Sequence, residues 1–136
     1  MQIDARDRLI VALDVPSAAE AERLVDRMGD HVRFVKVGLE LYTVAGPDIV
    51  RTMVDRGKRV FLDLKFLDIE ETVRRATARV AAMGATFLTV HANRKALLAA
   101  VQGRGQSNLK LLAVTVLTNF DGADLQDMGI QRSVRD

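Results

Sequence analysis

Apolar residues along this chain follow two alternating patterns. Short runs of β-branched or aliphatic residues recur at intervals of about 25 residues and begin at Leu9, Phe34, Val60, Thr86 and Leu111. Between the runs, apolar residues recur at the three- and four-residue spacing of one helix face. These helical sets are Ala21, Leu24, Val25 and Met28, then Ile49, Val50, Met53 and Val54, then Ile69, Val73, Ala76 and Val80. The pattern predicts a regular alternation of strand and helix.

Capping residues and glycines mark the ends of the predicted helices. Ser17 with Glu20 is typical of a capping box, and Asn93 can cap the helix that follows the fourth run. Pro47 stands where a first-turn proline is tolerated. A left-handed residue is favoured after a helix, and the glycines that follow helical stretches are Gly29, Gly57, Gly84 and Gly103.

The predicted fold class is α/β, because alternating units of this length give parallel strands covered by helices. An open doubly wound sheet and a closed (β/α)8 barrel both fit that class. The constant unit length favours the TIM-barrel type, for which eight such units amount to roughly 200 residues. Only about five units precede Asp136. We therefore expect residues 1–136 to form a single domain, a partial barrel whose C-terminal units are missing. The unpaired edges of its sheet could then pair with another chain.

Composition narrows the possible partners and the compartment. Hydrophobic residues make up 49% and charged residues 28%, which indicates a globular chain. The net charge of +2, with no block of like charges, gives no sign of nucleic-acid binding. No apolar run is long enough for a membrane span, and the N-terminus lacks a signal-peptide core. The absence of cysteine excludes thiol chemistry and fits a cytoplasmic location.

Charged residues interrupt or end the predicted strands. Asp63 and Lys65 lie two residues apart in the third run, so a regular strand would point both side chains to one face. Lys36 interrupts the second run, while Asp14 and His91 follow the first and fourth. Active sites of parallel barrels lie at the C-terminal ends of the strands. These residues therefore predict one converging site.

Each of these residues also has a structural explanation. A lone Asp14 or His91 can cap a loop, and Lys36 with Asp63 can form a buried ion pair, although desolvation makes such pairs uncommon. Asp68, followed by Glu71, fits a capping box for the third helix as well as it fits a catalytic role.

The chemistry that suits this set is proton transfer to carbon. Carboxylates at Asp63 and Asp68 favour the ammonium form of Lys65 between them, which makes this lysine a proton donor. Two lysines alternating with two aspartates can place a cation beside a developing carbanion while a carboxylate faces the substrate's own negative group. No metal is required, and the sequence contains no metal-ligand motif.

At these residues the sequence resembles the orotidine 5'-phosphate decarboxylase family. The family signature Asp-x-Lys-x-x-Asp-Ile is matched by Asp63-Leu64-Lys65-Phe66-Leu67-Asp68-Ile69, which is followed by Thr72-Val73. Three further segments are similar to the first, second and fifth strands of the family. They are Leu13-Asp14-Val15-Pro16, Val35-Lys36-Val37-Gly38 and Val114-Thr115-Val116-Leu117-Thr118. The resemblance spans residues 9 to 130.

The resemblance implies cofactor-free decarboxylation of orotidine 5'-phosphate to uridine monophosphate in de novo pyrimidine biosynthesis. By that resemblance Lys65 protonates C6 as carbon dioxide leaves, and Asp63 stands against the leaving carboxylate. Lys36 would orient Asp63 and the ribose, and Asp68 completes the charge array.

The resemblance also implies substrate contacts and a homodimer with shared sites. Asp14 would bind ribose hydroxyls, and Thr118 and Asn119 would lie at the pyrimidine edge. Asp68, Ile69 and Thr72 would reach into the neighbouring subunit's site.

The chain departs from the family pattern at several positions. The family usually has His at Leu67, Pro-Asn at Glu70 and Glu71, and Ser at Asn119. The first two differences alter a helix entry beside the subunit contact, and the third alters the pyrimidine-edge contact. The family's phosphate-binding arginine and closing loop belong to its last strands, beyond Asp136.

Two alternative functions remain open. Metal-dependent sugar-phosphate decarboxylases and synthases of the same superfamily share the Asp-x-Lys-x-x-Asp core, but they usually carry Glu near the second strand, where this chain has Lys36. The chain could also be a noncatalytic half-barrel fragment, or a module that assembles through its sheet edges.

Overall fold

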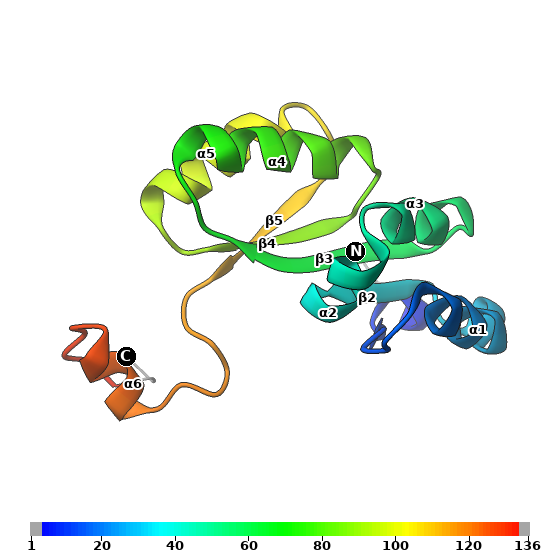
Figure 1. The fold of residues 1–136 in the computed structure, drawn as a ribbon, viewed down its shortest axis with the longest axis horizontal. Coiled ribbons are helices and arrows are strands. Elements are labelled where there is room, and N and C mark those ends of the chain that lie inside the picture. The colour runs from blue at the N-terminus through cyan, green and yellow to red at the C-terminus, as the bar shows by residue number, and fades with distance from the viewer. Residues whose placement is uncertain (1–3, 134–136) are drawn as a thin grey trace.

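Strands and helices alternate throughout residues 4–133, the part of the chain that the computed structural model describes (Figure 1). The strands are β1 (Ile10–Ala12), β2 (Phe34–Gly38), β3 (Arg59–Phe66), β4 (Phe87–His91) and β5 (Lys110–Val114). The α-helices are α1 (Ala18–Met28), α2 (Leu39–Ala45), α3 (Asp48–Asp55), α4 (Glu70–Ala82), α5 (Arg94–Arg104) and α6 (Gly122–Asp127). Short 3-10 turns cover Ala5–Asp7 and Gly29–His31. None of the helices in the described part is long and apolar enough to cross a membrane.

The strands form one parallel sheet in the order β1-β2-β3-β4-β5, so each strand pairs with its neighbours in sequence. Helices α4 and α5 pack closely on each other over the β3–β5 end of the sheet, and α1, α2 and α3 lie towards its β1–β3 end (Figure 1). The chain then runs from β5 through a long connection to α6, away from the sheet. This arrangement confirms the predicted class, the first five β/α units of a TIM-type barrel.

Two layers of side chains occupy one face of the sheet. Phe34 and Phe87 stack with their ring centroids 5.3 Å apart, and Phe61 meets Phe87 edge-on at 6.0 Å. The ladder pairs Phe34 with Arg59, whose guanidinium lies 4.5 Å from the centre of the Phe34 ring. Because alternate residues share a face, this aromatic layer lies one step before Lys36 and Asp63. It forms an apolar floor beneath the charges.

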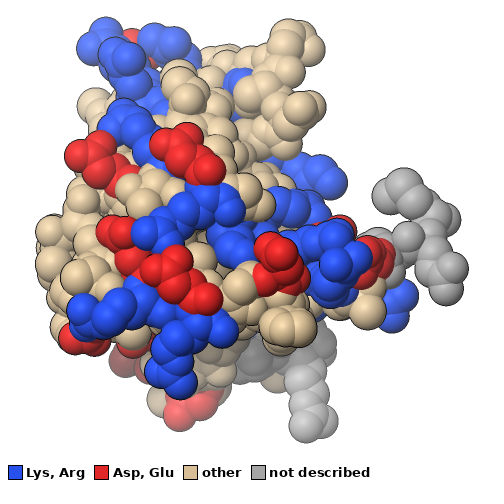
Figure 2. All heavy atoms as spheres, turned by 90° about the vertical axis from the view of Figure 1, so that its right-hand side faces the viewer, with Lys and Arg blue, Asp and Glu red and all other residues tan. Residues whose placement is uncertain are grey.

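One face of the molecule mixes charges of both signs. Figure 2 shows Lys and Arg side chains interspersed with Asp and Glu on the face that lies at the right of Figure 1. Arg56, at the end of α3, donates hydrogen bonds to Glu22 and Asp26 of α1. These ion pairs tie α3 to α1 across the surface.

Several predicted helix ends are confirmed. The Ser17 side chain accepts a hydrogen bond from the Glu20 amide, and the Asn93 side chain accepts from the amides of Lys95 and Ala96. Pro47 immediately precedes α3. The helix α2 was not predicted. It has only seven residues, and its exposed Leu39 and Val44 obscure the apolar face that Leu41 and its neighbours turn to the core.

The prediction that Gly103 ends a helix is wrong. Gly103 lies inside α5, and the residue that ends this helix is Gly105, with φ of 53°. A Cβ added at Gly103 would lie 2.2 Å from the carbonyl oxygen of Arg74 in α4. Glycine is required here by the close approach of two helices rather than by a left-handed backbone.

Candidate active site

A bulge in β3 places the two central charged residues. Leu62 pairs with Leu88 and Phe66 with Val90, so three residues of β3 stand opposite Thr89 alone. Lys65 has φ of 50°, the one positive value that a residue other than glycine shows in the described chain. Asp63 and Lys65 do share a side as predicted, but the regular strand assumed for them is wrong, because the backbone turns between them.

The carboxylate of Asp63 accepts two hydrogen bonds at one oxygen. Lys65 Nζ donates to Asp63 Oδ1 over 2.9 Å, and Thr89 Oγ1 donates to the same atom over 2.8 Å. Burial alone would raise the pKa of Asp63, but the two hydrogen bonds and the charges of Lys65 and Lys36 hold that pKa below its ordinary value. The Asp63 side chain, 18% exposed, therefore stays ionised beside a bound ammonium group.

A second ion pair adjoins the first. Lys36 Nζ donates to Asp14 Oδ1 over 3.2 Å, with Lys36 23% exposed and Asp14 64% exposed. Both of these atoms lie within 4 Å of the place that a Cβ on Gly38 would occupy, and the ladder pairs Gly38 with Asp63. The structure thus brings Asp14, Lys36, Asp63 and Lys65 together with alternating charge at the carboxyl ends of β1, β2 and β3.

Asp68 lies close to this array but does not cap α4. Its Oδ1 accepts from the amide of Ile69, which is itself the residue before α4 and makes no side-chain cap. The predicted capping box is wrong because Glu71 binds Arg74 and Arg75 instead. A hollow of about 280 Å³ lies between the end of β3 and α4, lined by Leu64, Lys65, Phe66, Leu67, Asp68, Thr72, Val73 and Ala76.

The remaining predicted residues lie at the surface. Ile69 is 70% exposed in the loop between β3 and α4, and Thr72 is exposed in the first turn of α4. Thr118 and Asn119 are exposed in the connection between β5 and α6. Within residues 4–133, no hydrogen bond joins Thr118 or Asn119 to the charge array. His91 ends β4 and is half-buried.

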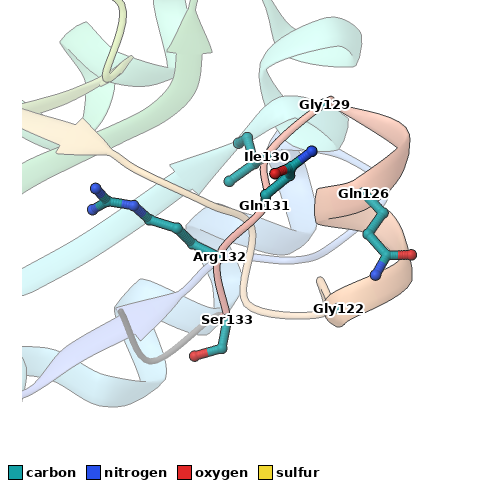
Figure 3. Close-up of a pocket in the computed structure, with 7 residues that line it drawn as sticks. All are labelled: Gly122, Gln126, Gly129, Ile130, Gln131, Arg132 and Ser133. Atoms are coloured by element: carbon teal, nitrogen blue, oxygen red, sulfur yellow. The ribbon is translucent and has the colours of Figure 1, made fainter.

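A larger hollow, of about 750 Å³, lies at the C-terminal segment (Figure 3). It is lined by Gly122, Gln126, Gly129, Ile130, Gln131, Arg132 and Ser133. All of these residues come from α6 and the stretch after it, and Arg132 is the one charged residue among them. We therefore place the candidate active site at the strand ends, where the charged residues gather, and not in this larger hollow.

The residue that sequence reasoning missed is Thr89. It is 5% exposed and holds Asp63 and the backbone of Lys65 at once. Threonine is common in strands, so its presence in the run Phe87-Leu88-Thr89-Val90 gave no sign that its hydroxyl contacts the site. In the described part of the chain, no group of three or more His, Cys, Asp or Glu side chains could hold a metal ion.

Comparisons with known proteins find relatives over nearly the whole chain. The family model "Orotidine 5'-phosphate decarboxylase / HUMPS family" matches residues 7–135. The orotidine 5'-phosphate decarboxylase of Rhodopseudomonas palustris strain HaA2 is 53% identical over 131 residues, which cover 96% of this chain and 56% of that protein. The one of Nitrobacter winogradskyi is 51% identical, over 97% of this chain and 55% of its own length.

A solved structure shows the same likeness in three dimensions. The crystal structure of orotidine 5'-phosphate decarboxylase from Lactobacillus acidophilus superposes with a TM-score of 0.83 at 36% identity, covering 92% of this chain and 60% of that one. This chain thus spans little more than half the length of the curated relatives that it matches. The family predicted from the motifs is confirmed: the chain belongs to the orotidine 5'-phosphate decarboxylase / HUMPS family.

Proposed function

We propose that this chain supplies the charge array of an orotidine 5'-phosphate decarboxylase, which converts its small-molecule substrate to uridine monophosphate and carbon dioxide without a cofactor. The observation that carries the proposal is the contact of Lys65 Nζ with Asp63 Oδ1 at 2.9 Å, next to the Lys36–Asp14 pair. Several relatives are named for this activity. The activity of the whole protein is part of the proposal, because the chain spans 56% of the first of those relatives.

In the proposed step, the bond between C6 of the pyrimidine and its carboxylate breaks. Carbon dioxide leaves, and the electron pair stays on C6. The Lys65 ammonium, held by Asp63, gives a proton to C6 and regains one from solvent. Because the cation is already in place and partly desolvated, the site need not reorganise as negative charge develops.

The neighbouring residues have proposed supporting roles. Lys36 lies between Asp14 and Asp63, where it can orient the Asp63 carboxylate and the ribose. Asp14 is 64% exposed, so its second carboxylate oxygen, Oδ2, can accept hydrogen bonds from ribose hydroxyls. Thr118 and Asn119 are proposed contacts of the pyrimidine edge.

A homodimer with shared active sites is part of the same proposal. Asp68, Ile69 and Thr72 are exposed where β3 passes into α4, and we propose that they reach a partner subunit's substrate. The proposed compartment is the cytoplasm, on the ground of a sequence without cysteine.

The test is a decarboxylation assay that follows the loss of orotidine 5'-phosphate absorbance. It uses the 136-residue chain alone and mixed with a second polypeptide that carries the remaining length of the Rhodopseudomonas palustris relative. We expect turnover in the mixture, and a loss of at least about 10³-fold in Lys65→Ala. Lys110→Ala, which removes a lysine from the opposite end of the sheet, should keep its turnover.

Two results would overturn the proposal. One is full turnover by Lys65→Ala, because the proton donor would then lie elsewhere. The other is activity that a chelator abolishes and magnesium restores, which would favour the metal-dependent decarboxylases and synthases of the superfamily.

A second candidate function is a noncatalytic half-barrel module. The observation in its favour is that β1 and β5 each pair on one side only within residues 4–133, and Leu112 of β5 is 38% exposed. Such a module predicts association of the chain in solution without turnover in the mixture. A monomeric mass with a sharp thermal transition would contradict it.

A further inference from the structure

We propose that Thr89 is a positioning residue for the decarboxylation, because its hydroxyl fixes both the Asp63 carboxylate and the backbone of Lys65. The inference rests on the proposed function for the identity of the reaction. The positioning itself is a property of the chain and can be measured without substrate.

The geometry is a closed ring of hydrogen bonds. The Lys65 amide donates to Thr89 Oγ1 over 2.9 Å, Thr89 Oγ1 donates to Asp63 Oδ1 over 2.8 Å, and Lys65 Nζ donates to the same oxygen over 2.9 Å. A hydroxyl has a single proton. Since the amide already supplies a proton to the Thr89 oxygen, the proton of the hydroxyl itself goes to Asp63.

The bulge explains why a side chain is needed in this place. Three residues of β3 stand opposite Thr89, so the Lys65 amide finds its acceptor in a hydroxyl of β4. Lys65 also holds a left-handed backbone with φ of 50°, a conformation that persists only where the surroundings support it. The hydrogen bond to Thr89 gives that support and lets the Lys65 side chain fold back to Asp63.

Thr89 is more deeply buried than the charged residues that it contacts. It is 5% exposed, whereas the side chains of Asp63 and Lys65 are 18% and 31% exposed. The charged groups that lower the pKa of Asp63 are Lys65 and Lys36, and Thr89 adds an uncharged donor. Loss of the hydroxyl should therefore impair the chemical step more than it impairs binding.

The experiment compares three substitutions. Thr89→Val keeps the shape and removes the hydroxyl, and Thr89→Ser keeps the hydroxyl. Thr77→Val is the matched control, because Thr77 is fully buried in α4 and its hydroxyl has no hydrogen-bond partner within residues 4–133. The first readout is the pKa of Asp63, from ¹³C NMR of its carboxyl group in the 136-residue chain. The second is kcat and KM in the reconstituted decarboxylation assay.

We expect Thr89→Val to raise the pKa of Asp63, because a hydrogen bond to the carboxylate is lost. We also expect kcat to fall roughly 10²-fold with little change in KM. Thr89→Ser should restore both values, and Thr77→Val should change neither. An Asp63 pKa that is unchanged in Thr89→Val, or a loss of kcat that Thr89→Ser does not restore, would overturn the inference. If the wild type lacks turnover, the proposed function fails, while the NMR titration still decides whether Thr89 positions Asp63.

Discussion

The close crossing of α4 and α5 leaves no room for a methyl group on Gly103. Gly103→Ala adds a methyl group whose carbon would lie 2.2 Å from the Arg74 carbonyl oxygen and 3.0 Å from Thr77 Cβ. A carbon–oxygen contact needs about 3.3 Å, so the two helices must separate locally by about 1 Å. The obstacle is backbone, which cannot rotate away as a side chain could.

Two opposing effects set the magnitude. In an open helix, Gly→Ala stabilises by about 1 kcal/mol. Overpacking a tight contact costs up to about 3 kcal/mol. The same separation would loosen Ala96, Ala99 and Ala100, which are nearly fully buried on α5. The net expectation is a loss of about 2 kcal/mol in the free energy of unfolding, a change of roughly 30-fold in the ratio of folded to unfolded protein.

The assay is urea unfolding followed by far-UV circular dichroism, with Gly122→Ala as the matched control. Gly122 begins α6, and a Cβ added to it would meet no atom within 4 Å from elsewhere in the described part of the chain. Its substitution should therefore leave the midpoint unchanged or raise it slightly. A Gly103→Ala midpoint at or above that of the wild type, with an unchanged m-value, would refute the steric reasoning.

Two further substitutions test local interactions. Asn93→Ala removes the side chain that accepts from two amides at the start of α5, and it should cost about 1 kcal/mol in urea unfolding, with Asn93→Asp retaining most of the stability. Hydrogen bonds from Arg74 and Arg75 lower the pKa of Glu71 from 4.5 to about 2. The ionised form of Glu71 therefore stabilises the fold fully above pH 4.5, and this stabilisation is lost as the pH falls towards 2. Glu71→Gln should therefore be less stable than the wild type near neutral pH and equal to it near pH 2, and a constant difference across this range would contradict the assignment.

The strands were predictable because burial leaves a plain signal. Val35 and Val37 of β2 are fully buried, and parallel strands covered by helices appear in sequence as continuous apolar runs. Each predicted run begins within one residue of an observed strand. The charged site residues could be predicted because Lys36 and Asp63 interrupt runs that are otherwise apolar.

The features that escaped prediction depend on contacts between distant segments. The bulge at Lys65 needs the hydroxyl of Thr89, which lies 24 residues further along the chain. The role of Gly103 depends on where α5 crosses Arg74. Local periodicity and capping patterns carry no information on either contact, so a helix end was predicted at Gly103 and a regular strand at Lys65.

The order of the strands has a consequence for how the chain acquires its structure during synthesis. Ile10 pairs with Phe34, Phe34 with Arg59, Phe61 with Phe87 and Phe87 with Lys110, so every strand pairing within residues 4–133 joins strands that are consecutive in the sequence. Loop-closure entropy is therefore similar at every step, and each unit can dock on the one before it as it leaves the ribosome. Asp63 can meet Lys36 as soon as β3 has docked, whereas its hydrogen bond to Thr89 must wait for β4. The charge array would thus be assembled from the N-terminal side, and the Lys65 backbone would be fixed only when the fourth strand arrives.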